Sequence, residues 1–176
     1  MRKMAMVLAG ALWLAPLAST ANTTSAKAPA PLEERIRKEL VMLPWYGVFD
    51  NLAFQVEGDQ VILSGQVWRP TLKSDAENVV KRLTGVRTVD NRIEVLPLSP
   101  FDNRIRLAAA RAIYGFPALN RYALGAHPSI HILVKNGEVT LEGVVDREAD
   151  RNLAGLLANG VFGAFSVTNN LRVVQS

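Results

Sequence analysis

The feature that most constrains the fold of this chain is a sequence that it contains twice. Residues 61–67 read VILSGQV, and residues 139–145, 78 positions later, read VTLEGVV. The chain of 176 residues is therefore expected to form two similar units of about seventy residues each, rather than one larger domain. The same offset aligns further identical residues downstream: Ala76 with Ala154, Gly85 with Gly163, Val89 with Val167, Asn91 with Asn169, and Val95 with Val173.

The repeated segment has the alternating pattern of a β-strand. Val61, Leu63 and Val67 would share one face of an extended chain, and the residues between them would point to the other face. Gly65 falls on the apolar face, and Gly143 does so in the second copy. A glycine in a strand indicates a close approach to the backbone. We expect a helix to cross the sheet at this point, and a bound ligand is the alternative.

The first copy contains patterns typical of two helices and three strands. Apolar residues with helical spacing lead to Pro44, and two short apolar runs on either side of a turn at residues 57–59 predict a hairpin. A strand–helix–strand connection of this length is right-handed, so the last strand should run parallel to the one before the helix. The predicted elements are a helix at 32–43, strands at 52–56 and 61–67, a helix opened by a capping box of Ser74 and Glu77, and a strand at 89–95.

The second copy repeats this order with one insertion, residues 118–128. Asp102 is placed to cap an alanine-rich helix, Asn136-Gly137 is a strong hairpin turn, and Asp146 is placed to cap the last helix. The predicted fold class is α+β, with two αββαβ units, each a three-stranded mixed sheet packed against two helices. Domain 1 is assigned to residues 32–97 and domain 2 to residues 98–176, and their short proline-containing connection predicts that they touch.

The N-terminal residues have the pattern of an export signal. Arg2 and Lys3 precede an apolar run that is followed by small residues, which predicts a cleavable signal peptide at residues 1–21 and a flexible tether at residues 22–31. The apolar run is short for a membrane span, so we expect no transmembrane span in the mature chain. The chain has no cysteine, and hence no acceptor thiol for a bacterial lipid anchor. These features predict a periplasmic protein.

The pattern of the repeat resembles a known family, the BON domain, which is named for bacterial osmotic-stress and nodulation proteins. The resemblance covers nearly all of the mature chain, with Ala164 as a mild departure where the pattern prefers valine. It implies an exported bacterial protein, often with tandem copies, that binds phospholipid or envelope surfaces, contributes to osmotic-stress tolerance and has no catalytic residues. The matching residues are Val61, Leu63, Gly65, Val67, Gly85, Val86, Val89, Asn91, Ile93 and Val95, and in the second copy Val139, Leu141, Gly143, Val145, Gly163, Val167, Asn169, Leu171 and Val173.

The residues that could carry chemistry do not form a recognisable catalytic or metal-binding pattern. His127 and His131 are the only histidines, and their spacing across a loop and a strand lacks the one-face geometry of a helical metal pair. Ser129 has no nucleophile-elbow sequence around it. The acidic residues at positions 146, 148 and 150 lie at a helix start, where acids are common. We therefore expect no enzyme, no cofactor and no metal.

The charge pattern argues against nucleic-acid binding. The formal net charge is +4, and it falls to +2 without Arg2 and Lys3 because 18 basic residues then face 16 acidic ones. Basic and acidic residues are interspersed, with no block of like charge that would follow a phosphate backbone.

The candidate contact residues are six aromatic and basic side chains. Two interpretations are open for the aromatic loop at residues 44–49: its rings insert at a lipid headgroup boundary, with basic residues beside them, or they pack on the small cores or between the copies. The predicted function is a non-catalytic envelope-binding protein whose partner is anionic phospholipid, with a protein-binding or chaperone-like adaptor as the alternative. That adaptor would use an exposed sheet face or the insertion. The six residues are Trp45, Tyr46, Phe49, Arg69, Arg121 and Tyr122.

Overall fold

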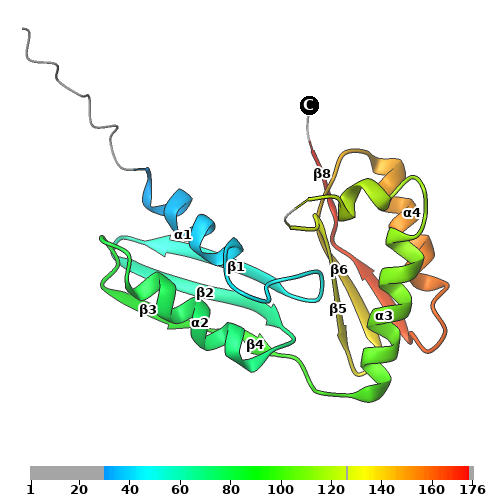
Figure 1. The fold of residues 1–176 in the computed structure, drawn as a ribbon, viewed down its shortest axis with the longest axis horizontal. Coiled ribbons are helices and arrows are strands. Elements are labelled where there is room, and N and C mark those ends of the chain that lie inside the picture. Colours follow the sequence, from blue (N-terminus) through cyan, green and yellow to red (C-terminus); the bar gives the residue numbers. More distant parts are fainter. Residues whose placement is uncertain (1–29, 126, 175–176) are drawn as a thin grey trace, which may run out of the picture.

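A computed structural model describes residues 30–125 and 127–174 of the chain. Within these residues the chain forms two α+β units joined by a short connection, as the repeat predicts (Figure 1). The predicted signal peptide at residues 1–21 and all but the end of the tether lie outside the described residues. Among the helices of the described residues, none combines the length and the hydropathy that a membrane span requires.

The first unit is a mixed sheet with two helices on one face. Strand β1 pairs antiparallel with β2, and the third strand runs parallel to β2 in two short pieces, β3 and β4. Apolar side chains of both helices and of β2 form one core. The elements are α1 (Leu32–Val41), β1 (Asn51–Glu57), β2 (Gln60–Val67), α2 (Pro70–Lys81), β3 (Thr88–Asn91) and β4 (Glu94–Val95).

The second unit has the same plan and adds a short 3-10 helix in the insertion. Strand β5 pairs antiparallel with β6, and β7 and β8 run parallel to β6. The predicted αββαβ order is thus confirmed in both units. The elements are α3 (Pro100–Tyr114), η1 (Asn120–Ala123), β5 (Ile130–Lys135), β6 (Glu138–Val145), α4 (Glu148–Asn159), β7 (Ser166–Asn169) and β8 (Arg172–Val173).

The repeated asparagines explain the interruption of the third strand. The side-chain amide of Asn91 donates to the carbonyl of Lys73 in α2 at 2.9 Å, and its oxygen accepts the amide of Ile93 at 3.2 Å. Asn169 makes the equivalent bonds to Arg151 and Leu171, at 2.8 Å and 3.2 Å. The same side chain therefore ties the strand to the helix and closes a tight turn in each unit.

Several local expectations were wrong. Neither Asp102 nor Asp146 is an N-cap: Ser99 caps α3, where its hydroxyl accepts the amide of Asp102 at 3.2 Å, and the N-cap residue of α4 is Arg147, which makes no side-chain cap bond.

Helix α2 begins at Pro70, with Arg69 as the N-cap, four residues before the predicted capping box. Proline suits the first helical turn because no partner is needed there for an N–H. Ser74 lies inside the helix, where its hydroxyl donates to the carbonyl of Thr71 at 2.9 Å.

The repeated glycines make room for the neighbouring strand and not for a helix. A Cβ at Gly65 would lie 2.1 Å from the carbonyl oxygen of Asn51, and a Cβ at Gly143 would lie 2.0 Å from that of Ser129. Both glycines also have positive φ angles, +111° and +119°. Only a residue without a side chain combines this backbone conformation with so close an approach.

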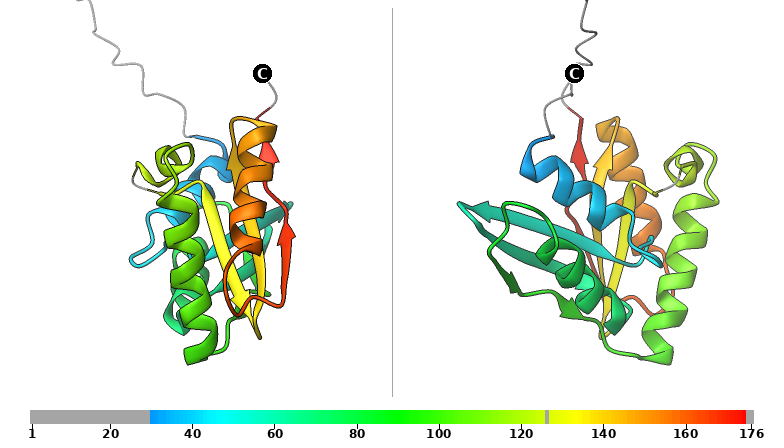
Figure 2. Two further views of the ribbon diagram at one scale, coloured as in Figure 1. Left: turned by 90° about the vertical axis from the view of Figure 1, so that its right-hand side faces the viewer. Right: turned by 60° about the vertical axis from the view of Figure 1, so that its left-hand side comes forward.

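The two units are packed against each other, as their short connection predicts. The first unit lies on the face of the second sheet opposite α3 and α4, and viewed from the helices it stands behind that sheet (Figure 2). On this face Leu133 is only 3% exposed. Lys135 forms an ion pair with Glu94 of the first unit at 2.5 Å.

Candidate functional site

The aromatic loop at residues 44–49, between α1 and β1, is held in shape by the buried carboxylate of the next residue, Asp50. Asp50 is 3% exposed and accepts hydrogen bonds from the backbone amides of Gly47, at 3.1 Å, and Trp68, at 2.7 Å. Burial raises the pKa of this carboxyl, and the two amide bonds partly offset that effect. Asp50 therefore fixes the loop to the turn between β2 and α2.

Trp45 projects from this loop into solvent. Its side chain is 70% exposed, and its backbone has a φ of +71°, a conformation that bulky residues rarely adopt. The guanidinium carbon of Arg69 lies 4.8 Å from the centre of the Trp45 ring and 5.5 Å from that of Trp68. The structure thus brings together two of the predicted contact residues, with a cation between two indole rings.

Tyr46 points the other way, toward the second unit. Its ring centre lies 5.6 Å from that of His131 and 6.2 Å from that of His127, and burial raises the pKa of its hydroxyl. The His131 Nδ1 is 3.2 Å from the carbonyl oxygen of Gly47. Because a carbonyl only accepts, Nδ1 carries the proton in this contact. Burial lowers the pKa of His131, which favours the neutral ring at the junction.

Phe49 also belongs to the junction between the units. Its ring lies edge-on to that of Trp68, with centres 6.1 Å apart, and it packs on the apolar core of the second unit together with Val48. Of the three predicted loop aromatics, Trp45 alone is among the exposed large apolar residues of the described chain.

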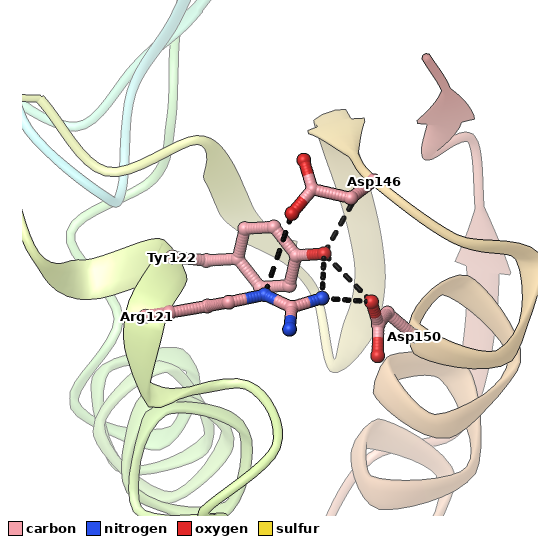
Figure 3. Close-up of polar contacts among 4 residues, drawn as sticks. All are labelled: Arg121, Tyr122, Asp146 and Asp150. Carbon is pink, nitrogen blue, oxygen red and sulfur yellow. Dashed lines mark hydrogen bonds and ion pairs between the residues drawn. The ribbon is translucent and has the colours of Figure 1, made fainter. Parts of the chain in front are cut away.

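Arg121 and Tyr122 are engaged in a polar network of the second unit (Figure 3). The Tyr122 hydroxyl donates to the Asp150 carboxylate at 2.7 Å and accepts the backbone amide of Asp146 at 2.9 Å. Arg121 forms ion pairs with Asp150 and, at 3.4 Å, with Asp146. Tyr122 is only 7% exposed. This network fastens the insertion to the start of α4, and the six predicted residues do not form one exposed surface.

A second aromatic cluster was missed by the sequence interpretation. Phe101 and Phe165 lie with ring centres 5.8 Å apart, and the Arg104 guanidinium carbon is 5.7 Å from the centre of the Phe101 ring. Phe162 is 100% exposed and Phe165 is 75% exposed. Because the 78-residue offset places Thr84 and Arg87 at these two positions of the first unit, a comparison of the copies would have found them. Phe101, Phe162 and Phe165 are called the phenylalanine patch below.

The described residues contain no group of three or more His, Cys, Asp or Glu side chains placed to hold a metal ion. The arrangement is suited to binding another molecule through exposed indole and phenyl rings and the guanidinium groups beside them.

The chain was compared with known proteins. The BON domain family model matches residues 30–97 and residues 118–175. No curated protein matches. One similar solved structure is CdsD, a structural protein of the type III secretion system of Chlamydia trachomatis, with 15% identity, a TM-score of 0.32, and coverage of 82% of this chain and 93% of that chain. A second structure, of the CdsD C-terminal domain, has 15% identity, a TM-score of 0.30, and coverage of 84% of this chain and 99% of that chain.

Proposed function

This chain belongs to the BON-domain family, and from that premise we propose that it is a non-catalytic periplasmic protein that binds anionic phospholipid at envelope surfaces. The family favours an envelope-associated binding role, and the tandem copies follow its common organisation. Export by the signal peptide at residues 1–21 and a part in osmotic-stress tolerance belong to the same proposal.

The observation that carries the proposal is the exposed, strained position of Trp45. A φ of +71° costs a non-glycine residue about 1–3 kcal/mol, and such strain is found mostly at functional sites. The strain holds an amphipathic ring outward, where it leaves 70% of its surface in water. Indole rings favour the headgroup region of a membrane, so this geometry suits a shallow lipid contact.

Arg69 supplies the charge for an anionic headgroup. It forms no ion pair with any carboxylate of the described residues, because the nearby Asp50 is buried and bonds to backbone amides. Its guanidinium remains next to the exposed indole. A lipid phosphate could thus meet the cation while the ring enters the interface.

The other predicted contact residues have positioning roles in this proposal. Tyr46 and Phe49 anchor the loop to the second unit and so fix the direction of Trp45. Arg121 and Tyr122 hold the insertion, whose His127 packs against Tyr46.

Co-sedimentation with lipid vesicles tests the proposal. The predicted mature protein, residues 22–176, should sediment with phosphatidylglycerol vesicles at low salt, less at high salt, and little with neutral phosphatidylcholine vesicles. Trp45→Ala and Arg69→Gln should each weaken binding several-fold. Phe162→Ala, which removes an even more exposed ring elsewhere, is the matched control and should bind normally. Wild-type binding by both variants would reject Trp45 and Arg69 as the contact, and absence of binding to any vesicle would reject the lipid function.

A protein-binding adaptor is the second candidate function, and the phenylalanine patch favours it. Exposed aromatic residues with an arginine beside them are a common composition of protein interfaces. A photo-crosslinking residue placed at Phe162 in cells should then capture one protein of defined mass, whereas the same residue at Asn78, at an exposed polar position of α2, should not. Equal labelling from both positions would count against an interface at the patch.

A further inference from the structure

Each outward-facing residue of the outer edge of β5 has one backbone group that bonds to another part of the chain. The amide of Ile132 donates to the carbonyl of Val48 in the first unit at 2.7 Å. The carbonyl of Ile130 accepts the Tyr114 hydroxyl, and that of Val134 accepts an Arg106 N–H at 2.6 Å. An edge strand with satisfied backbone groups does not recruit another strand.

The equivalent edge of β1 lacks most of these partners. The 78-residue offset matches Leu52, Phe54 and Val56 to the three residues of β5. A backbone hydrogen bond at Leu52 lowers the pKa of the Tyr46 hydroxyl, so Leu52 is partly engaged. Within the described residues, no backbone hydrogen bond joins Phe54 or Val56 to any segment other than β2. Arg37 does not cap this edge; its guanidinium carbon lies 5.8 Å from the centre of the Phe54 ring.

A cavity of about 270 Å³ lies beside this edge, between the two units. This volume is close to the lower limit of roughly 300 Å³ for small-ligand pockets, so it suits one or two residues of an extended chain. Its walls are formed by α1 and β1 on one side and by the face of the second sheet on the other. The apolar lining residues are Leu40, Val41, Leu52, Phe54 and Val144.

The polar groups of the cavity suit a carboxylate. Arg37 and Arg172 line it, no acidic residue does, and neither arginine forms an ion pair among the described residues. The Ser129 hydroxyl lies at the same cavity, buried and without a hydrogen-bond partner in the described structure. Two guanidinium groups and a free hydroxyl donor are the groups that recognise a carboxylate. Glu33 and Glu142 line an adjoining pocket, which Arg37 and Arg172 also line.

We propose that this cavity binds the extended C-terminal end of a partner polypeptide. The partner segment would pair with β1 through the free backbone groups at Phe54, and its terminal carboxylate would lie between Arg37 and Arg172. Strand addition supplies affinity from main-chain bonds, and the carboxylate fixes which end of the partner is bound. This site is separate from Trp45, so it stands or falls independently of the lipid contact.

Fluorescence anisotropy with labelled synthetic peptides tests the proposal. The probe is a six-residue peptide of alternating valine and threonine with a free C-terminal carboxylate, and the comparison peptide has a C-terminal amide. The mature protein should bind the carboxylate peptide at least tenfold more tightly. N-methylation of the peptide amides that face β1 should abolish binding, and this result does not depend on the folding of any protein variant.

Three protein variants complete the test. Arg37→Gln and Arg172→Gln should each lower affinity for the carboxylate peptide several-fold and leave affinity for the amide unchanged. Arg82→Gln, which removes an exposed charge away from the cavity, is the control. Equal affinity for the two peptides, or no effect of either arginine variant, would overturn the proposal. Binding of short-chain phosphatidylglycerol that depends on Arg172, with no binding of either peptide, would assign the cavity to a lipid headgroup and would also overturn it.

Discussion

The amide of Ile132 donates a hydrogen bond to the carbonyl of Val48 at 2.7 Å, so a loop of the first unit completes the edge of the second unit's sheet. The loop that presents Trp45 to solvent is therefore the same loop that joins the units. The orientation of Trp45 depends on the inward-facing residues of the loop, because Phe49 packs on the core of the second unit and Asp50 fixes the turn. We expect the units to unfold as one cooperative structure.

Arg106 should be important to the junction through its packing more than through its charge. The side chain is fully buried, and one of its N–H groups donates to the carbonyl of Val134. Its guanidinium carbon lies 5.9 Å from the centre of the Trp68 ring, and two of its nitrogens have no hydrogen-bond partner in the described structure. Arg106→Ala should lower the free energy of unfolding by about 2–4 kcal/mol, because it leaves a cavity. Arg106→Met should cost less than about 1.5 kcal/mol, because it fills the space and removes a buried charge. Urea denaturation measures both, and equal losses would contradict this explanation.

Gly143 should tolerate no side chain. Gly143→Ala would place a Cβ 2.0 Å from the carbonyl oxygen of Ser129 at a φ of +119°, so the two strands would have to separate. We expect a loss of at least ~3 kcal/mol in the free energy of unfolding. Gly58→Ala is the matched control, since Gly58 also has a positive φ, +64°, but no atom lies within 4 Å of where its Cβ would be. This variant should lower the free energy of unfolding by about 1–2 kcal/mol. Similar thermal stability of the two variants would show that the close approach is unimportant.

The Tyr122 hydroxyl should stabilise the insertion. Tyr122→Phe removes the bond to Asp150 and the acceptor for the Asp146 amide. Leaving these two groups without their partner should lower the free energy of unfolding by about 1–3 kcal/mol. Arg151→Ala, which breaks an exposed ion pair with Glu148, should cost less than about 0.5 kcal/mol. If hydrogen exchange at residues 119–124 is no faster in Tyr122→Phe, the network does not hold the insertion.

His131 should make stability fall as the solution becomes acidic. Burial lowers its pKa below the ordinary value of 6.5, so the unfolded chain binds a proton there before the folded chain does. Stability should therefore decrease as pH falls below 6.5 and level off below the folded pKa. Two charged neighbours act in opposite directions: Glu142 raises the pKa and His127 lowers it. The pKa of Asp50 is raised above 3.8, so protonation of Asp50 favours the folded state and increases stability, in more acidic solution than the change at His131.

Denaturation between about pH 7 and pH 5 checks this dependence. His131→Gln should flatten the decrease, because glutamine can still donate to the carbonyl of Gly47 but does not titrate. His127→Gln, at an exposed neighbouring position, should leave most of the decrease in place. An unchanged pH dependence in His131→Gln would assign it to other groups.

The repeat explains why so much of the fold could be predicted from the sequence. Alternation in residues 61–67 and 139–145 identified the central strand of each sheet, and the helical spacing identified the faces that cover it. The start of α2 was missed because Ser74 and Glu77 have the spacing of a capping box, whereas the helix already begins at Pro70, a residue that suits the first helical turn. The role of Gly65 was missed because a gap between strands depends on backbone angles that composition does not reveal.

The candidate site was harder to predict, because it depends on how the units dock. The sequence identified Trp45 as a surface candidate, but its pairing with Arg69 needs the turn after β2 to fold back on the loop. Tyr46 and Phe49 have the same aromatic character as Trp45, and only the position of the second unit turns them inward. Tyr122 was grouped with the contact residues because its buried partner Asp150 lies 28 residues away in the chain.

The central claim is that Trp45 enters the headgroup region of an anionic membrane, and its own fluorescence tests this most directly. In the predicted mature protein, Trp68→Phe leaves Trp45 as the single tryptophan, since the only other one lies within residues 1–21. With phosphatidylglycerol vesicles, the emission of Trp45 should shift to shorter wavelength and become protected from acrylamide, and neutral vesicles should produce neither change. Emission that stays unshifted and fully quenchable while the protein sediments with the vesicles would contradict the account.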